Sequence, residues 1–286
     1  MFRSVSTVAV FILAAVSPTV SPFPTDSWRS SMSNSAASGD ARPVVLVTGA
    51  LAGIGRATAL AFGAAGYRVV VSGRRPEAGK ALEEALRALD HEARFVEADV
   101  RFEEQVSALI DTTVRHFGRL DIAVNNAGID GKFRSILEHD AKSYQEVFDA
   151  NVLGTFLSMK HELRAMRSRG SGSIVNISST MGTRGALNAS LYAGSKHAVE
   201  GMTKAVALEA APFSIRVNAV APGPVQTEMF DRIAVDAGGR DAMIAGVPLK
   251  RLGTVEEIAQ MILFVASDKV PFLTGEVIRV NGGKTA

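Results

Sequence analysis

The sequence predicts an α/β fold, a doubly wound parallel sheet of about seven strands with helices on both faces. From residue 42 onward, short apolar runs alternate with segments that have helical spacing. The apolar runs lack a polar face, as is typical of parallel strands covered on both sides. A glycine-rich turn follows the first run and opens the first helix. We see no internal repeat, and therefore expect one domain at residues 42–286.

The strands and helices of this domain are expected in strict alternation. We predict strands at 43–49, 67–73, 93–100, 120–128, 172–179, 214–223 and 276–283. The helical segments are 54–65, 76–89, 102–118, 143–169, 191–211 and 254–267. Pro76 suits the first turn of its helix, and Thr254 with Glu257 forms a capping-box pattern. The segment 225–247 is expected to be a loop that covers a substrate.

The composition excludes several classes of function. The chain has no cysteine, which excludes disulfides, cysteine nucleophiles and thiolate metal sites. Its five histidines show no paired spacing, so no metal site is predicted. The formal charge is +2, and basic residues are scattered among acidic ones, so the sequence shows no basic patch of the kind that binds nucleic acids.

Residues 1–41 differ from the rest and are expected to be a disordered N-terminal extension. An apolar run from Val8 to Val16 is too short to span a bilayer but suits the core of a signal peptide. The segment is either a genuine targeting or export signal, or the result of a start codon placed ahead of a true start at Met32. We favour the second interpretation and a cytoplasmic location, with export as the alternative.

The glycine-rich turn is Thr48-Gly49-Ala-Leu-Ala-Gly53-Ile54-Gly55. Glycines at these positions let the backbone turn tightly and approach a pyrophosphate, while the following helix N-terminus offers free N–H groups. Because the turn follows the first strand, it predicts nucleotide binding and a Rossmann-type domain. Its spacing resembles the motif of the short-chain dehydrogenase/reductase family, classical type, and the resemblance extends over about Val44 to Gly283.

The resemblance implies the cofactor-binding residues along the chain. It assigns the adenine to Asp99 and Val100, with a simple helix N-cap as the alternative role of Asp99. The Asn-Asn-Ala-Gly segment after the fourth strand implies a turn lining the cofactor groove. The implied set is Thr48, Gly49, Gly53, Ile54, Gly55, Asp99, Val100, Asn125, Ala127, Gly128, Tyr192, Lys196, Pro222, Gly223, Val225 and Thr227.

Tyr192 and Lys196 are four residues apart in a predicted helix and therefore share one face. A nearby ammonium lowers the pKa of a phenol, which lets it exchange protons more readily. An ordinary surface pair has the same spacing. In the family that this chain resembles, the tyrosine is the general acid/base and Ser179 bonds the substrate oxygen, with Ser178 as the alternative. Asn151, an unfavourable residue inside a helix, is implied to support a water relay.

The choice of cofactor depends on the end of the second strand. The family position for the acidic residue that selects NAD holds Gly73, followed by Arg74 and Arg75. Arginine suits the 2′-phosphate of NADP, so we predict NADP, with NAD as the alternative. Ala52 stands where many NADP-dependent members carry a basic residue.

The resemblance implies an oxidoreductase that interconverts a carbonyl and a secondary alcohol by hydride transfer. Similar sequences include glucose 1-dehydrogenases and 3-oxoacyl-carrier-protein reductases. The alternative is a nucleotide-sensing or scaffold protein on the same fold. Family members usually form tetramers, so we expect a homotetramer with a small-molecule substrate and no stable membrane span. The natural substrate is not predicted, although Met229, Phe230 and Met243 suggest a partly hydrophobic pocket.

Overall fold

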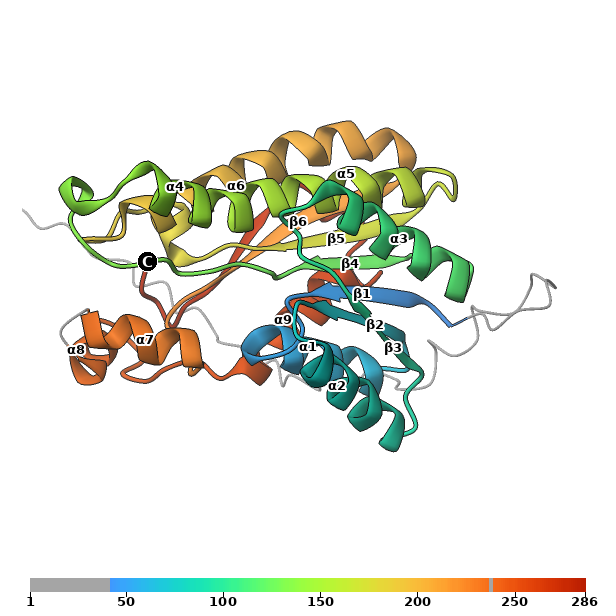
Figure 1. The fold of residues 1–286 in the computed structure, drawn as a ribbon, viewed down its shortest axis with the longest axis horizontal. Helices are drawn as coiled ribbons and strands as arrows, with labels where there is room; N and C mark the ends of the chain where they lie inside the picture. Colours follow the sequence, from blue (N-terminus) through green and yellow to red (C-terminus); the bar gives the residue numbers. More distant parts are fainter. Residues whose placement is uncertain (1–41, 237–238) are drawn as a thin grey trace, which may run out of the picture. The chain divides into compact units, whose positions relative to one another are not determined.

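A computed structural model describes residues 42–236 and 239–286 (Figure 1). Seven parallel strands form one sheet in the order β3-β2-β1-β4-β5-β6-β7, which confirms the predicted fold class. The strands are β1 Val44–Thr48, β2 Arg68–Gly73, β3 Ala93–Glu97, β4 Ile122–Asn125, β5 Gly172–Ile177, β6 Ile215–Pro222 and β7 Val277–Val280. The predicted N-terminal extension, 1–41, lies outside the described residues.

Helices cover both faces of this sheet. They are α1 Gly53–Ala64, α2 Pro76–Ala88, α3 Glu103–Phe117, α4 Ala141–Phe148, α5 Gly154–Arg167, α6 Ser190–Ala210, α7 Glu228–Asp236, α8 Arg240–Ala245 and α9 Val255–Ala266. Figure 1 shows α1, α2 and α9 on one side of the strands and α3, α5 and α6 on the other. Within the described part of the chain, no helix is both long and apolar enough to cross a membrane.

The two hydrophobic cores follow from the alternation of side chains along each strand. On β1, Val45 and Val47 pack with Phe62 of α1 and Ile262 of α9. Their neighbour Leu46 points to the opposite face and packs with Met159 of α5. All of these side chains are fully buried or nearly so. A strand of this sheet must therefore be apolar throughout, which is why the sequence pattern identified the strands.

Two predicted elements differ from the structure. The helix expected at 143–169 is interrupted by a π-helix at Asp149–Leu153, between α4 and α5. Asn151 lies within it, and its side chain bonds to a neighbouring loop, which explains why the regular ladder is broken there. The segment 225–247 contains helices α7 and α8 and is not simply a loop. The Thr227 Oγ1 accepts from the Phe230 N–H at 3.1 Å at the start of α7, and Phe230 is buried.

The capping box predicted at the start of α9 is confirmed. Thr254 Oγ1 accepts from the Glu257 N–H at 3.2 Å, and Glu257 Oε2 accepts from the Thr254 N–H at 2.9 Å. Together these bonds satisfy two of the N–H groups that a helix start leaves free.

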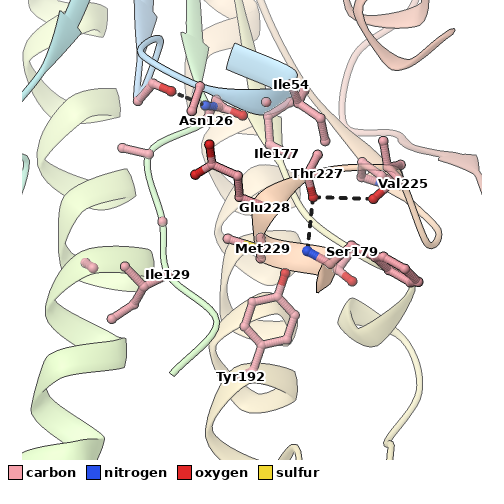
Figure 2. Close-up of a pocket in the computed structure, with 18 of the residues that line it drawn as sticks. Ile54, Asn126, Ile129, Ile177, Ser179, Tyr192, Val225, Thr227, Glu228 and Met229 are labelled. Atoms are coloured by element: carbon pink, nitrogen blue, oxygen red, sulfur yellow. Dashed lines mark hydrogen bonds between the residues drawn. The ribbon is translucent and has the colours of Figure 1, made fainter. Parts of the chain in front are cut away.

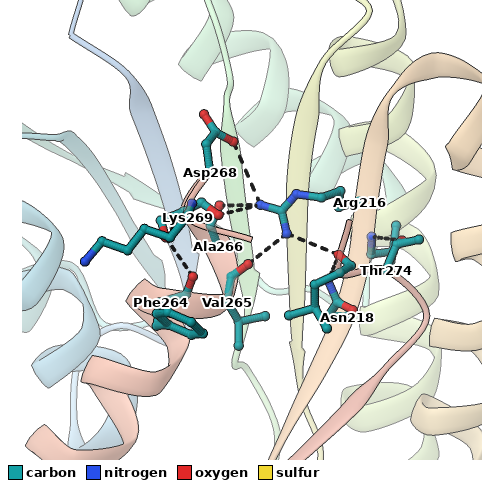
Figure 3. A network of polar contacts seen from close by, with 11 residues as sticks. Arg216, Asn218, Phe264, Val265, Ala266, Asp268, Lys269 and Thr274 are labelled. Atoms are coloured by element: carbon teal, nitrogen blue, oxygen red, sulfur yellow. Dashed lines mark hydrogen bonds and ion pairs between the residues drawn. The ribbon is translucent and has the colours of Figure 1, made fainter. Parts of the chain in front are cut away.

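Arg216 of β6 stabilises the opposite end of α9 (Figure 3). Its buried guanidinium donates to the carbonyls of Val265, Ala266 and Ser267, each at 2.9 Å, and to that of Leu273 at 3.3 Å. A helix leaves its last carbonyls without partners, and a cation suits the negative end of its dipole. Arg216 thereby ties α9 to the loop that leads to β7.

The topology places a cleft at one edge of the sheet. From β1 the chain proceeds to β2 and β3 on one side, then returns to β4 and continues to β7 on the other. The direction of winding therefore changes between β1 and β4. In open α/β sheets, ligands bind beyond the carboxyl ends of the strands at this switch point.

Candidate active site

A cavity of about 810 Å³ opens at the switch point. The predicted site residues that line it come from the glycine turn, the ends of β2 to β6 and helix α6. They are Thr48, Gly49, Gly53, Ile54, Arg74, Arg75, Asp99, Val100, Ala127, Gly128, Ser179, Tyr192, Lys196, Pro222, Gly223, Val225 and Thr227. Three other predicted residues, Gly55, Asn125 and Asn151, lie outside the lining.

The glycine turn brings backbone very close to the segment after β4. A Cβ on Gly49 would lie 2.7 Å from the Cα of Ala127, and one on Gly55 would lie 2.4 Å from the Asn126 Nδ2. Gly49 and Gly53 also have φ angles of +61° and +51°, which favour glycine. The N-cap of α1 makes no side-chain hydrogen bond, and its first turn has no acidic residue. These features fit the pyrophosphate of a dinucleotide.

Asn126 fastens the glycine turn, although the sequence did not single it out. Its Nδ2 donates to the carbonyls of Thr48 and Gly49 at 3.1 and 2.9 Å. In return, Thr48 Oγ1 accepts from the backbone N–H groups of Asn126 and Ala127 at 3.2 and 3.3 Å. The signal was present as the second asparagine of Asn-Asn-Ala-Gly, and Figure 2 shows its side chain at the glycine-turn end of the cavity.

Asp99, which follows β3, also lines the cavity. Both of its carboxylate oxygens accept from Arg101, at 2.6 to 3.0 Å, and Arg74 Nη1 lies 3.9 Å away. Burial opposes the ionisation of Asp99, but the hydrogen bonds and charge of Arg101, together with Arg74, lower its pKa overall. Arg101, which belongs to none of the sequence motifs, therefore holds the carboxylate that was predicted to bind the adenine.

Tyr192 and Lys196 lie one turn apart on α6, as expected, and both are buried. The Lys196 Nζ donates to the Ile177 carbonyl at 2.9 Å and lies 5.7 Å from the centre of the Tyr192 ring. Figure 2 shows the Tyr192 hydroxyl pointing into the cavity toward Ser179. Ser179 Oγ accepts from the Met181 N–H at 3.2 Å, which fixes the turn after β5.

The expected lowering of the Tyr192 pKa is wrong for this structure. Burial raises its pKa to about 12, and the charge of Asp130 acts in the same direction, while hydrogen bonding to Ser179 opposes them. Burial likewise lowers the pKa of Lys196 to about 8. Desolvation is therefore the largest influence on the pKa of each group. Tyr192 is accordingly a protonated phenol at neutral pH.

Asn151 is buried and does not line the cavity. Its Oδ1 accepts from the Ile129 N–H at 2.8 Å, and its Nδ2 donates to the Ile129 carbonyl at 2.9 Å and to Ser195 Oγ at 3.0 Å. The Ser195 hydroxyl in turn donates to the Tyr192 carbonyl at 2.7 Å. Both amide hydrogens of Asn151 thus make hydrogen bonds. The side chain therefore connects Ile129, in the segment after β4, to α6, the helix that carries Tyr192.

Asn125 does not contact the cavity, contrary to the prediction that it binds the cofactor. Its Nδ2 donates to Glu162 Oε2 of α5 and to Asn176 Oδ1 of β5, both at 3.0 Å. Asn125 and Asn176 are register partners across the two strands. Burial raises the pKa of the fully buried Glu162 to about 8, although the Asn125 hydrogen bond opposes this. This buried cluster joins β4 and β5 just before the residues that line the site.

Helices α7 and α8 border the substrate end of the cavity. Phe230, Ala234 and Leu252 form a small core there, with Met243 of α8 packed against it. Arg232 of α7 donates to both oxygens of Asp130 at 3.2 and 3.3 Å, which links α7 to the segment after β4. This end of the cavity therefore combines apolar side chains with the charged side chains of Glu228 and Arg232.

Comparisons with known proteins agree with this geometry. Residues 49–285 match a family model described as enoyl-(acyl carrier protein) reductase. A cis-4-hydroxycyclohexanecarboxylate dehydrogenase of Sinomonas cyclohexanicum is 40% identical, over 86% of this chain and 98% of that protein. A cyclohexanol dehydrogenase of Acinetobacter sp. is 38% identical, over 85% and 95% of the two chains.

Solved structures agree as well. The structure of ElxO with NADP bound superposes with a TM-score of 0.80 at 37% identity, covering 85% of this chain and 98% of that one. Both the family model and the relatives extend over most of the described fold, and the relatives are dehydrogenases. The chain therefore belongs to the short-chain dehydrogenase/reductase family, as its motifs predicted, and is an NAD(P)-dependent oxidoreductase that interconverts alcohols and carbonyl compounds.

Proposed function

We propose that this enzyme uses NADP to interconvert a cyclic secondary alcohol and its ketone, with Tyr192 as the general acid/base. The observation that carries the proposal is the cavity itself. Ser179, Tyr192 and Lys196 line it together with the glycine turn, so the acid/base group and the dinucleotide cradle share one space. The dinucleotide supplies the hydride-transfer chemistry when bound.

The residues of this chain would position the substrate and would exchange a proton with its oxygen. Ser179 and Tyr192 hold the substrate oxygen, and Tyr192 gives its phenolic proton to that oxygen during ketone reduction. In alcohol oxidation Tyr192 takes the proton back. Lys196 places a positive charge beside the ring, which favours the phenolate that remains after donation. Asn151 acts as a positioning residue through Ile129 and Ser195.

The preference for NADP rests on the end of β2. Arg74 and Arg75 follow Gly73 and line the cavity, so guanidinium groups are available for a 2′-phosphate. Asp99, the nearby carboxylate, is engaged by Arg101 and is not at the position that selects NAD. Arginine binds phosphate well because its donors form a planar fork. The neighbour ElxO was solved with NADP.

The preference for a cyclic substrate rests on the apolar side chains at the substrate end of the cavity and on the relatives. Met181, Met229, Phe230, Ile233 and Met243 line that end. Apolar side chains of this kind accept a saturated ring. The two relatives described above act, by name, on cyclohexanol and on a hydroxycyclohexanecarboxylate.

The assembly and the compartment are further proposals. The π-helix and α5 expose Leu153 and Phe156, and α4 exposes Tyr144. Apolar side chains at a helix surface favour association, so we infer a homo-oligomer, with a tetramer as the specific expectation. Light scattering on the purified protein measures this. The cysteine-free sequence and the nicotinamide cofactor support a cytoplasmic enzyme, which fractionation of the native cells would test.

The function is tested with Tyr192→Phe, which removes only the phenolic oxygen. We expect kcat for reduction of a cyclohexanone by NADPH to fall at least about a hundredfold. The Kd for NADPH should change little, because the ring remains in place. Tyr144→Phe is the matched control, since Tyr144 is half exposed on α4 and does not line the cavity. A variant that retains most of its activity would refute the role of Tyr192, and wild-type protein that binds NADPH but reduces no ketone would favour the sensor alternative.

A further inference from the structure

Two basic residues, Lys284 and Arg184, contact each other next to the cavity. Lys284, near the C-terminus, lines the same cavity as Ser179 and Tyr192. Arg184 follows the turn after β5, and its Nη1 donates to the Lys284 carbonyl at 3.0 Å. The two residues are a hundred positions apart in sequence, so the fold has brought them together.

Neither cation has an acidic partner among the residues that the structure describes. Burial lowers the pKa of Lys284, and the charge of Arg184 lowers it further. The contrast is Arg232, which lines the same cavity but is paired with Asp130. Adjacent like charges destabilise each other, and an anion placed between them would remove that repulsion.

The backbone around Lys284 is held in a defined turn. Asn281 Oδ1 accepts from the Gly283 N–H at 3.0 Å, and the Asn281 carbonyl accepts from the Lys284 N–H at 3.2 Å. Gly282 and Gly283 both have positive φ angles. The Lys284 Nζ lies only 3.3 Å from where a Cβ on Gly246 would stand, at the end of α8. The backbone of Lys284 is therefore held in place, and its side chain extends to the end of α8.

A purely structural role for this lysine would be to stabilise the end of α8. That end already has a cation, because Lys250 Nζ donates to the Ala245 carbonyl at 2.8 Å. In contrast, no hydrogen bond of the Lys284 ammonium is found within the described part of the chain, and Lys284 lines the cavity. An ammonium in such a place suits a charged group on a bound molecule.

We propose that Lys284, supported by Arg184, binds a carboxylate carried by the substrate, so that the enzyme prefers cyclic hydroxy acids and keto acids over neutral alcohols and ketones. This inference rests on the proposed function. The reacting oxygen lies at Ser179 and Tyr192, and the carboxylate lies at the opposite end of the carbon ring. A charge-assisted hydrogen bond then selects the substrate and orients it for reduction.

The test compares two ketones that differ by one carboxylate, cyclohexanone and 4-oxocyclohexanecarboxylate, with NADPH as reductant and the full chain as enzyme. In Lys284→Gln we expect KM for the keto acid to rise about tenfold, with KM for cyclohexanone unchanged. Lys250→Gln is the matched control and should alter neither KM. Added salt should raise KM for the keto acid alone. Equal changes for both ketones, no change for either, or weaker NADPH binding would overturn the proposal.

A second measurement keeps this inference separate from the proposed function. Titration calorimetry of NADP-loaded protein with cyclohexanecarboxylate measures binding without turnover. Wild type should bind it about tenfold more tightly than Lys284→Gln does, while both melt at the same temperature. If neither ketone is reduced but this difference is found, the proposed reaction is wrong and the carboxylate site stands. If wild type and variant bind equally, the carboxylate site is refuted whatever the turnover.

Discussion

Glu162 provides a quantitative test of the buried cluster beneath the site. Its side chain is 0% exposed, and Oε1 has no hydrogen-bond partner in the described residues. Burial raises its pKa from 4.5 to about 8, so the folded protein keeps a proton that the unfolded chain has released. Between these two pKa values the folded state binds more protons. The stability of the protein therefore falls as the pH rises.

The size of this effect follows from the two pKa values. They differ by about 3.5 pH units, and each unit corresponds to about 1.4 kcal/mol. The limiting loss is therefore about 5 kcal/mol, most of it between about pH 5 and pH 8. A loss of this size is a large part of the net stability of a typical domain.

The assay is urea unfolding of wild type and Glu162→Gln at matched pH values and one protein concentration. Glutamine keeps the shape of the neutral acid but does not titrate. The difference in unfolding free energy, wild type minus variant, should fall by about 5 kcal/mol from about pH 4 to pH 9. Subtracting the variant removes the contribution of the other carboxylates. A difference that stays flat across this range would mean that Glu162 is ionised in the folded state, and the reasoning would be wrong.

Two further substitutions test contacts described above. Arg216→Met removes the donors to four carbonyls near the end of α9 and should destabilise the fold by about 2–4 kcal/mol, measured by urea unfolding. Arg279→Met, on the exposed face of β7, is its control, and an equal loss in both would contradict the assigned role. Gly55→Ala places a methyl group against Asn126 and should weaken NADPH binding at least about tenfold, measured by fluorescence titration. Gly201→Ala, in open space on α6, should leave that Kd unchanged, and unaltered binding by Gly55→Ala would refute the close-approach argument.

Sequence patterns predicted the fold and most of the cavity lining because their causes are local. Strands such as β1 must be apolar on both faces, and the glycine turn needs the φ angles of Gly49 and Gly53 whatever surrounds it. The spacing of Tyr192 and Lys196 is likewise fixed by the helix. These features could therefore be identified before any tertiary contact was known.

Features of the site that depend on burial in the folded protein could not be predicted from sequence patterns. Asn125 ends β4, and residues alternate between the faces of a strand, so its side chain points toward α5 and away from the cavity. The sequence alone does not show whether the last side chain of a strand lines the cleft or packs against a helix. The pKa of Tyr192 is set by desolvation, which is a property of the whole fold, and the motif alone suggested the opposite direction. Lys284 could not be predicted as a substrate-binding residue, because its place in the cavity lining depends on where the C-terminal segment after β7 lies.

The π-helix at Asp149–Leu153 has a consequence for the two helices that it joins. A wider turn holds one residue more than a regular one, so the side chains after it are rotated by about 100° relative to those before it. Phe148 of α4 can therefore face Gly194 of α6, while Leu157 and Met159 of α5 are buried beneath it. The extra residue lets the continuous segment α4–α5 present differently rotated faces before and after it. Asn151 lies in the π-helix where this rotation occurs.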